Sequence, residues 1–581
     1  MRLEKTSCLR TLQKLNFLLE PTLNPFPTRL RYPMNAPNFA LYYVGDGYST
    51  AQKIMGRQSA GKSLMRGVAR KWQNAIVNGF GNGQASLQQM VDQLKSDGFT
   101  SKVRWFEERA ATQPQTLNAV YFPAPLTRSV VERRNVIGPT RYSLFGVTHT
   151  LSSKAAMDQI ADLILPPFQP WDGLICTSAA ALGVVDYLHE EARDYWASTL
   201  GATRFNPIAK AIIPLGVNAP DFTPAAQRRA MARNGLDLNE DEVCFLFAGR
   251  MTFHGKANPV AFYQAVEAVC QRLKKRLVCI EAGIFSNDAI AAAFREAQQT
   301  LAPSARFIGV NGKDQAAYDS AWAASDVFVS LSDNIQETFG ITPVEAMAAG
   351  LPVIVSDWNG YKDTVRDGVD GFRIPVTIPS VGVGAELAAR HESDVDTYDM
   401  FIGRVSMATA VDTSVLTDRI YDLATNSDLR QKMGQAGRQR VCTEFDWPIV
   451  LDQYTAFATE LGVIRSKAAQ SSVRHVRPSR PDPFALFAHY PTSILSGEMR
   501  VIANPAHYGK AEAFMELGIA RYVIHPTLLP KDAILGLLAT AAEETSVANI
   551  LASCPQFDVN VKTNALMWLM KMNLLLPSRP I

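Results

Sequence analysis

Residues 333–357 read Asp-Asn-Ile-Gln-Glu-Thr-Phe-Gly-Ile-Thr-Pro-Val-Glu-Ala-Met-Ala-Ala-Gly-Leu-Pro-Val-Ile-Val-Ser-Asp. An apolar run at 326–331 precedes this stretch and a second run at 351–356 lies inside it, and each predicts a short buried strand. Between the runs, Gly340 is followed by a helix that we expect to begin near Thr342. A helix that starts at the carboxyl end of a strand presents free N–H groups, and open α/β sheets bind phosphates there. The stretch therefore predicts an anion-binding site.

Two carboxylates flank the predicted anion site, Glu337 and Glu345. A carboxylate beside a phosphate would repel it, so we expect both to bind neutral hydroxyl groups, which donate hydrogen bonds to carboxylates. Hydroxyl groups next to a phosphate indicate a nucleotide sugar.

Three motifs closely resemble the donor-site signature of the retaining GT-B glycosyltransferases of family four, the group 1 glycosyl transferases. They are Phe-Gly-x-x-x-x-Glu-Ala-Met-Ala-Ala-Gly-Leu-Pro-Val-Ile from 339, Gly-Tyr-x-Asp-x-Val at 360–365 and Asp-Gly-Val-Asp-Gly-Phe at 367–372. The resemblance extends roughly over residues 37–463. It implies an α/β protein with two Rossmann-like, doubly wound domains that face a cleft, with the acceptor on the first domain and the donor on the second. It also implies transfer of a hexose from a nucleoside diphosphate sugar to an acceptor hydroxyl, with retention.

The resemblance assigns roles to the residues of the stretch. Glu337 would hold the hydroxyls of the donor sugar and Glu345 those of the ribose. The acceptor would attack from the side of the leaving group, and the departing phosphate would take its proton. The backbone N–H groups expected to bind the phosphate belong to Phe339, Gly340, Ile341 and Thr342.

Two cations follow the first expected strand of the second domain, at 243–248. Arg250 comes directly after Gly249, and Lys256 lies six residues further on. A diphosphate leaving group gains negative charge as the glycosidic bond breaks, and a planar guanidinium with an ammonium can stabilise that charge without a metal. An arbitrary pair of this kind is more often a solvated loop, but the spacing matches the diphosphate-binding Arg and Lys of the family. We therefore expect Arg250 and Lys256 to be catalytic and Gly249 to contact the donor.

His149 ends an expected strand at 142–148 of the first domain. A lone histidine is more often structural than catalytic. Its place at the carboxyl end of a strand resembles that of the family's histidine near the reaction centre, so we include it among the catalytic candidates.

The sequence Gly-Arg-Gln-Ser-Ala-Gly-Lys-Ser at 56–63 matches the P-loop pattern letter for letter. A P-loop needs its first glycine directly after a buried strand, whereas the expected strand at 39–44 ends about a dozen residues earlier. We interpret the motif as the glycine-rich loop of the first domain, in which Gly61 opens a helix at 62–72 and lets the backbone approach the donor phosphate or the acceptor. A nucleotidase that uses Lys62 is the less favoured alternative.

The helix at 62–72 carries four bases, which form either a solvated face or a site for anionic lipid. The second interpretation leaves open a peripheral contact with the inner membrane surface. The bases are Lys62, Arg66, Arg70 and Lys71.

Composition sets further limits. The 581 residues are too many for one core, so we expect about three domains. A net charge of +3 argues against a dedicated nucleic-acid binder. The seven cysteines are scattered, mostly in apolar runs, and we expect reduced thiols in a cytoplasmic protein. No apolar run of about 18 residues predicts a membrane span.

We expect no metal and no cofactor, because the substrate itself is the nucleoside diphosphate sugar. Asp394 and Asp396 have the spacing of a metal-binding Asp-x-Asp. No strand precedes them, and they lie in a Gly/Pro/Ser/Asp-rich stretch that we expect to be irregular.

Apolar runs and amphipathic stretches alternate along the chain, which predicts parallel, doubly wound sheets. The last hundred residues contain helical segments and faintly resemble the closing helix of a winged-helix domain. Their balanced charges argue against DNA binding and favour a protein contact. The expected parts are a mobile arm at 1–36, an acceptor domain at 37–215, a donor domain at 216–463 with an insertion at 376–412 and a last helix that crosses back, a linker at 464–483, and a helical accessory module at 484–581.

A third hypothesis is a non-enzymatic interaction protein on a GT-B scaffold. The intact pair of cations and pair of glutamates argue against it. The sequence does not indicate the nucleotide base, the sugar, the oligomeric state or whether residues 1–33 belong to the mature protein. The acceptor stays open among a saccharide, a lipid-linked saccharide and a protein.

Overall fold

The computed structural model describes residues 36–48, 56–108, 117–222, 226–468, 478–521 and 529–578. The chain forms two compact units, Met1–His475 and Val476–Ile581. Residues 1–35 of the predicted N-terminal arm lie outside the described part of the chain.

The first half of the large unit is built on a seven-stranded parallel sheet in the order β3-β2-β1-β4-β5-β6-β7. Separate hydrophobic clusters cover its two faces, so several strands are buried on both sides and are almost wholly apolar. The strands are β1 Phe39–Tyr42, β2 Val77–Gly81, β3 Val103–Glu107, β4 Ala119–Tyr121, β5 Ser143–Val147, β6 Gly173–Cys176 and β7 Ala209–Ile212. The helices are α2 Gly45–Tyr48, α3 Gly56–Lys71, α4 Gly83–Ser96, α5 Arg128–Ile137, α6 Lys154–Ala161 and α7 Ala179–Leu200.

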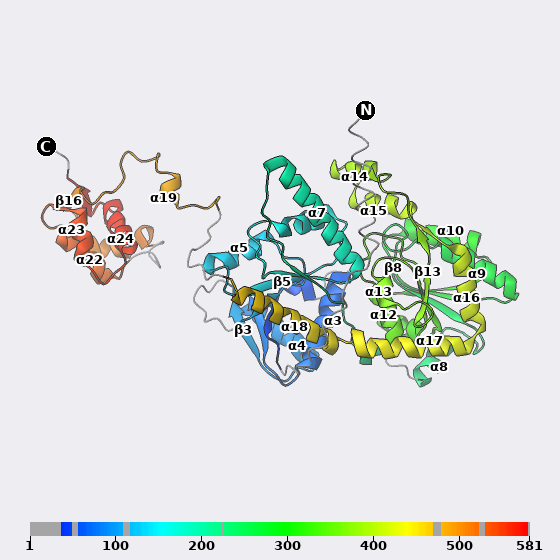
Figure 1. Cartoon of the computed structure of the whole chain (residues 1–581). Helices are drawn as coiled ribbons and strands as arrows, with labels where there is room; N and C mark the ends of the chain where they lie inside the picture. Colours follow the sequence, from blue (N-terminus) through cyan, green and yellow to red (C-terminus); the bar gives the residue numbers. More distant parts are fainter. Residues whose placement is uncertain are drawn as a thin grey trace, which may run out of the picture. The chain divides into compact units, whose positions relative to one another are not determined.

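The second half of the large unit has a six-stranded parallel sheet in the order β10-β9-β8-β11-β12-β13, again covered on both faces. The strands are β8 Cys244–Met251, β9 Val278–Phe285, β10 Arg306–Asn311, β11 Val327–Ser330, β12 Val353–Ser356 and β13 Gly371–Ile374. The helices include α8 Ala226–Gly235, α9 Val260–Leu273, α10 Asp288–Leu301, α11 Gln315–Ala324, α12 Ile341–Ala348, α13 Tyr361–Thr364, α16 Thr413–Thr425 and α17 Ser427–Arg440. The prediction of two doubly wound α/β domains is confirmed (Figure 1).

A long helix, α18 (Trp447–Ser466), follows the second sheet and packs against the first domain (Figure 1). The ring of Tyr454 lies 5.3 Å from that of Tyr121, and the Asn118 side chain donates a hydrogen bond to the carbonyl of Ala458 at 2.6 Å. The last helix of the second half therefore ties the two sheets into one unit.

The stretch at 376–412 is not irregular, as the sequence suggested, but contains two helices. Its ends pair as antiparallel strands β14 (Val376–Thr377) and β15 (Ala410–Val411), with α14 (Ala385–Glu392) and α15 (Tyr398–Met407) between them. The buried carboxylate of Asp396 joins the two helices, because it pairs with Arg390 at 2.9 Å and with Arg404 at 3.1 Å. Composition alone does not predict these two ion pairs.

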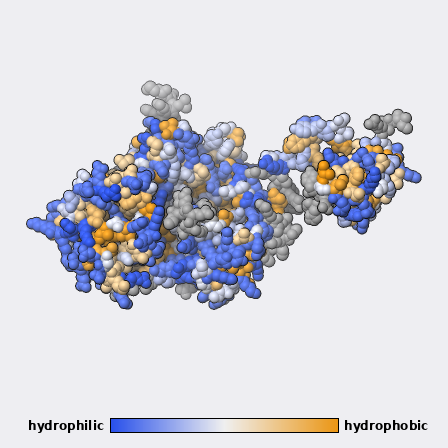
Figure 2. Space-filling view, turned by 180° about the vertical axis from the view of Figure 1, so that it is seen from behind, coloured by the Kyte–Doolittle hydropathy of each residue, from blue (hydrophilic) through white to orange (hydrophobic). Residues whose placement is uncertain are grey.

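The small unit has a three-stranded antiparallel sheet in the order β17-β16-β18 and its own hydrophobic core. It also exposes large apolar side chains, among them Phe484 and Ile519, and hydrophobic patches are visible on its surface in Figure 2. Its elements are α19 Pro483–Leu486, β16 Arg500–Ala503, α20 Ala511–Glu516, α21 Gly518–Arg521, α22 Lys531–Thr540, β17 Thr545–Ser546, α23 Val547–Ala552, α24 Val559–Lys571 and β18 Leu575–Pro577.

Within the described ranges, no helix combines the length and the apolar character that a membrane crossing requires.

Candidate active site

The carboxyl end of β8, the loop that follows it and the loop after β11 bring the predicted cations and the first glutamate together. These strands are neighbours in the second sheet, so their carboxyl ends meet at one edge. Lys256, from the loop after β8, forms an ion pair with Glu337, from the loop after β11. Arg250 lies beside them and donates a hydrogen bond from Nη2 to the side-chain oxygen of Gln336 at 2.5 Å. We call Arg250, Lys256, Gln336 and Glu337 the cation–glutamate cluster.

The Lys256–Glu337 pair is shielded from water: the two side chains are 15% and 18% exposed. Burial alone would raise the pKa of Glu337, but the Lys256 ammonium and a hydrogen bond from the Gly340 N–H outweigh burial and lower that pKa. Burial would lower the pKa of Lys256, but the attraction of Glu337 outweighs it and raises that pKa. Both groups therefore stay charged at neutral pH.

The backbone around these residues requires glycine at Gly340. Its φ of +81° suits glycine, and a Cβ there would lie 1.9 Å from the ring of Tyr361. Tyr361 is fully buried on α13 and its hydroxyl hydrogen bonds to Ser330 at the end of β11. The ring thus holds the start of α12 in place at the carboxyl end of the strand.

The amino end of α12 carries the four residues predicted to bind phosphate through N–H groups. Gly340 is the residue that precedes the helix, Ile341 and Thr342 form its first turn, and the Phe339 side chain is buried in the core below. The Gly340 N–H donates to Glu337 at 3.1 Å. The hydroxyl oxygen of Thr342 is buried and has no hydrogen-bond partner within the described residues. An unpaired buried hydroxyl at a helix N-terminus fits an anionic ligand.

Glu345 lies one turn further along α12. Burial raises its pKa to about 7, and Lys256 opposes this only in part. Glu345, within α12, and Glu337, in the loop before it, thus differ in protonation at neutral pH.

Gly249 lies in β8 with a φ of +152°, and the nearest atoms to a Cβ there would be Lys256 Cε and Phe247 Cζ, both at 3.8 Å.

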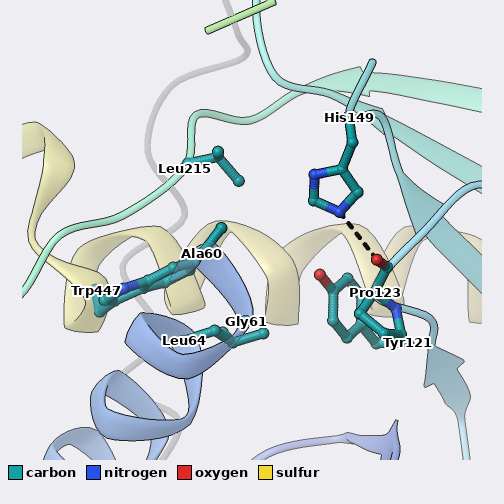
Figure 3. Close-up of a pocket in the computed structure, with 8 residues that line it drawn as sticks. All are labelled: Ala60, Gly61, Leu64, Tyr121, Pro123, His149, Leu215 and Trp447. Atoms are coloured by element: carbon teal, nitrogen blue, oxygen red, sulfur yellow. Dashed lines mark hydrogen bonds between the residues drawn. The ribbon is translucent and has the colours of Figure 1, made fainter. Parts of the chain in front are cut away.

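His149 and Gly61 lie together on the first domain, away from the cation–glutamate cluster in sequence. They line one pocket (Figure 3), in which the ring of His149 hydrogen bonds through Nε2 to the carbonyl of Pro123 at 2.9 Å. The full lining is Ala60, Gly61, Leu64, Tyr121, Pro123, His149, Leu215 and Trp447.

The P-loop motif lies inside α3, which begins at Gly56 and not, as predicted, at Lys62. Gly61 is therefore a helical residue and not part of a loop. It permits close packing, because a Cβ there would lie 2.0 Å from the carbonyl oxygen of Gly47. The hydroxyl of Ser63, the last residue of the motif, accepts a hydrogen bond from the Trp447 indole at 2.8 Å. A helix cannot wrap a triphosphate, so the geometry does not favour a nucleotidase.

Three of the four bases of α3 form ion pairs, although Arg66 remains exposed. Each pairs with a carboxylate of the same unit: Arg66 with Asp221, Arg70 with Asp446 and Lys71 with Asp452, at 2.5, 2.9 and 2.7 Å. Lys62 is exposed. The two pairs with residues 446 and 452 fix α18 to the first domain.

The first domain contacts the loop after β11 at residues that the sequence did not single out. Ser178, which precedes α7, donates a hydrogen bond to the carbonyl of Thr338 at 2.7 Å. The hydroxyl of Tyr398, from the inserted helix α15, lies 3.1 Å from the side-chain nitrogen of Gln336. Gln336 precedes the predicted Glu337, so its position in the sequence could have indicated a place in the site. Nothing in the sequence near Tyr398 indicates a role for that residue.

No group of three or more His, Cys, Asp or Glu side chains with the geometry to hold a metal ion occurs in the part of the chain that the structure describes. The Asp394 carboxylate pairs with Lys154 at 2.6 Å and Asp396 with two arginines.

Comparison with known proteins finds a family match within the second domain. Residues 229–401 match the family described as glycosyl transferases group 1. The chain is 28% identical over 241 residues to the phosphatidyl-myo-inositol mannosyltransferase of Mycobacterium tuberculosis, which covers 42% of this chain and 51% of the relative. It is 32% identical over 192 residues to the D-inositol 3-phosphate glycosyltransferase of Streptomyces bingchenggensis, with 32% and 40% covered. The chain thus spans about half the length, or less, of these relatives.

Solved structures also resemble the chain. The crystal structure of Anabaena HepE in complex with UDP has a TM-score of 0.45 at 14% identity and covers 73% of this chain and 99% of that one. The sucrose-phosphate synthase from Thermosynechococcus elongatus has a TM-score of 0.42 at 16% identity, with 73% and 99% covered.

Proposed function

We propose that this chain, whose residues 229–401 match the group 1 glycosyl transferases, transfers a hexose from a nucleoside diphosphate sugar to an acceptor hydroxyl with retention and without a metal. The observation that carries the proposal is the cation–glutamate cluster at the amino end of α12. It combines two cations, a partner carboxylate and the amino end of a helix at one edge of a sheet. Retention itself rests on the family resemblance.

Each group has a task in the proposed reaction. Arg250 and Lys256 stabilise the charge that develops on the diphosphate as the glycosidic bond breaks, so no metal is needed. The N–H groups at the start of α12 and the Thr342 hydroxyl bind the phosphate. Glu345 accepts hydrogen bonds from the ribose hydroxyls.

The Lys256–Glu337 ion pair holds these two side chains next to each other before the donor binds. In the complex, the diphosphate attracts Lys256 and the hydroxyls of the sugar donate to Glu337. The acceptor hydroxyl attacks the anomeric carbon from the side of the leaving group, and its proton passes to the departing phosphate. His149, on the first domain, contacts the donor sugar near the reaction centre.

The acceptor is proposed only as a class: a hydroxyl of a saccharide, of a lipid-linked saccharide or of a protein. The two relatives named above carry inositol in their names, which is consistent with a polyol hydroxyl. We place the protein in the cytoplasm, with a peripheral membrane contact as a secondary proposal. The exposed apolar side chains at 484–581 support a protein partner for that module.

A thermal unfolding screen tests the proposal. Purified protein is heated with UDP-, GDP- or ADP-sugars in the presence of EDTA, beside a Lys256→Met variant. Saturation at 100 times Kd adds about 2.7 kcal/mol to the unfolding free energy, so one nucleotide class should raise the melting temperature of the parent protein more than that of the variant. Stabilisation by ATP alone, with hydrolysis that Lys62→Ala removes, would instead support the nucleotidase.

A further inference from the structure

The inserted helix α15 starts at the junction of the two domains. It rests on the second domain, where the amide of Asn258 approaches the sulfur of Met407 at 3.9 Å and a Cβ at Gly403 would lie 3.1 Å from His254. Its first residue, Tyr398, points across to the first domain. The insertion therefore contacts both halves of the large unit.

The Tyr398 hydroxyl has three polar neighbours. Two belong to the loop that follows His149 in the first domain: Ser152 Oγ lies at 2.8 Å and Thr150 Oγ1 at 3.2 Å. The third is the side-chain amide of Gln336, whose Nε2 donates to the hydroxyl at 3.1 Å. The tyrosine is partly buried. One hydroxyl thus links three segments that are far apart in the sequence.

The other end of the Gln336 amide holds Arg250. Its Oε1 accepts the hydrogen bond from the guanidinium at 2.5 Å, while the Gln336 N–H donates to Asn334 Oδ1 at 2.8 Å. Arg250 is otherwise exposed, and its hydrogen bond to the carbonyl of Gly255 is long, at 3.4 Å. Without Gln336 the guanidinium would be free to turn.

We infer that Tyr398 is a positioning residue that orients Arg250 through the amide of Gln336, an inference that rests on the proposed function. A guanidinium stabilises a diphosphate best when its planar fork faces the phosphate oxygens, so an orientation fixed in advance lowers the barrier. The Tyr398 hydroxyl fixes one end of the amide, which leaves the other end to face Arg250. The insertion thereby makes the geometry of a donor-domain arginine depend on contact with the first domain.

A second link between the insertion and the first domain provides a matched control. The Lys154 ammonium donates to the carbonyl of Glu392 at 2.8 Å and pairs with Asp394 at 2.6 Å. Lys154→Ala loosens the attachment of the insertion but leaves Tyr398, Gln336 and Arg250 untouched. It therefore separates a general role of the insertion from the orientation of Arg250.

Steady-state transfer kinetics with the donor nucleotide sugar test the inference on the full chain. Tyr398→Phe removes one hydroxyl, and Gln336→Met replaces the amide by a side chain of similar size. Each variant loses one hydrogen bond in the chain that orients the Arg250 guanidinium. We expect kcat to fall by about three- to ten-fold in each. The KM for the donor should change less than about two-fold, because the orientation of the Arg250 guanidinium matters most in the transition state, when charge develops on the diphosphate. Lys154→Ala should keep the kcat of the parent.

The combination with Arg250→Ala is decisive. If Tyr398 acts through Arg250, then Tyr398→Phe has no further effect on kcat in the Arg250→Ala background. An unchanged kcat in Tyr398→Phe, an equal loss in Lys154→Ala, or losses that multiply with Arg250→Ala would each overturn the inference while the parent still transfers sugar. A parent protein that transfers sugar from no nucleotide donor would overturn the proposed function and this inference with it.

Discussion

Glu337 and Glu345 show how two carboxylates of one candidate site acquire different pKa values. Glu337 has a cation at hydrogen-bond distance, so its pKa is low despite burial. Glu345 has burial without such a partner, so its pKa rises to about 7. The spacing of the glutamates was visible in the sequence, but their protonation depends on Lys256, which reaches only one of them.

The raised pKa of Glu345 predicts a pH dependence of nucleotide binding. In the proposed complex the ribose hydroxyls donate to the Glu345 carboxylate, so the affinity for the nucleotide should rise as the pH rises through 7 and the group ionises. From pH 6 to pH 8 the ionised fraction grows about ten-fold, so Kd of the parent should fall by up to about ten-fold relative to Glu345→Gln, which does not titrate. Calorimetric titration with the nucleoside diphosphate measures both proteins, and the ionisation of the phosphate cancels in their ratio. Parallel pH profiles would refute the assigned partner.

The same residue predicts a stability effect of opposite sense. A carboxyl whose folded pKa lies above its ordinary value of 4.5 stabilises the fold below pH 4.5 and loses that contribution as the pH rises through 7. Glu345→Gln should therefore flatten the decline in unfolding free energy between pH 5 and pH 8. Urea unfolding at these two pH values measures the difference, and a slope equal to that of the parent would contradict it.

Helix α12 depends on one backbone position at its amino end. Gly340→Ala places a methyl group against the ring of Tyr361 in a φ region that disfavours alanine. Unfavourable φ alone costs about 1–3 kcal/mol, and the contact adds to it. Gly309→Ala is the control, since Gly309 lies in β10 with open space around its Cα and no positive φ. Chemical denaturation should show a loss for Gly340→Ala only, and equal losses would mean that α12 relaxes around the methyl group.

The strands that could be predicted from the sequence are those whose own residues are mostly apolar. β11 and β12 are uninterrupted apolar runs between turn residues, because parallel strands covered on both faces need no polar side. β2 was missed because it reads Val-Asn-Gly-Phe-Gly: its glycines make room for Trp105, whose ring atoms would lie within 3.0 Å of a Cβ at Gly79. A strand shaped by a distant tryptophan has no local signal.

Helix α3 shows the opposite case: its sequence matches a functional motif, but its structure is not the one that the motif requires. Because the P-loop letters are wound into a helix, Lys62 cannot reach a phosphate through a cradle of N–H groups. Lys62→Ala should change the Kd for the nucleoside diphosphate by less than about three-fold, within the range typical of exposed substitutions. A collapse of binding, together with ATP hydrolysis by the parent, would restore the nucleotidase hypothesis.

At the scale of the whole molecule, the small unit should be dispensable for the large one. The two units have separate hydrophobic cores and separate sheets. A chain that ends at residue 475 keeps α18, including the hydrogen bonds of Arg465 to the first domain. We expect it to unfold cooperatively and to bind the nucleoside diphosphate like the full chain, measured by calorimetry. An aggregated product would show that residues 476–581 belong to the core.

The two cations and Glu337 have separate roles in the proposed reaction. Charge on the leaving diphosphate peaks in the transition state, so Arg250→Ala should lower turnover by roughly 10² to 10³ and weaken nucleotide binding much less. Glu337→Ala should abolish transfer but leave the affinity for the free nucleoside diphosphate unchanged or tighter, because the change frees Lys256 from its ion pair.

Calorimetry of the free nucleoside diphosphate, run beside a transfer assay with the intact sugar donor, measures this separation directly. The predicted result is that Glu337→Ala binds the nucleotide at least as tightly as the parent while transfer is lost. An equal loss of nucleotide affinity in Arg250→Ala, Lys256→Ala and Glu337→Ala would contradict the central claim.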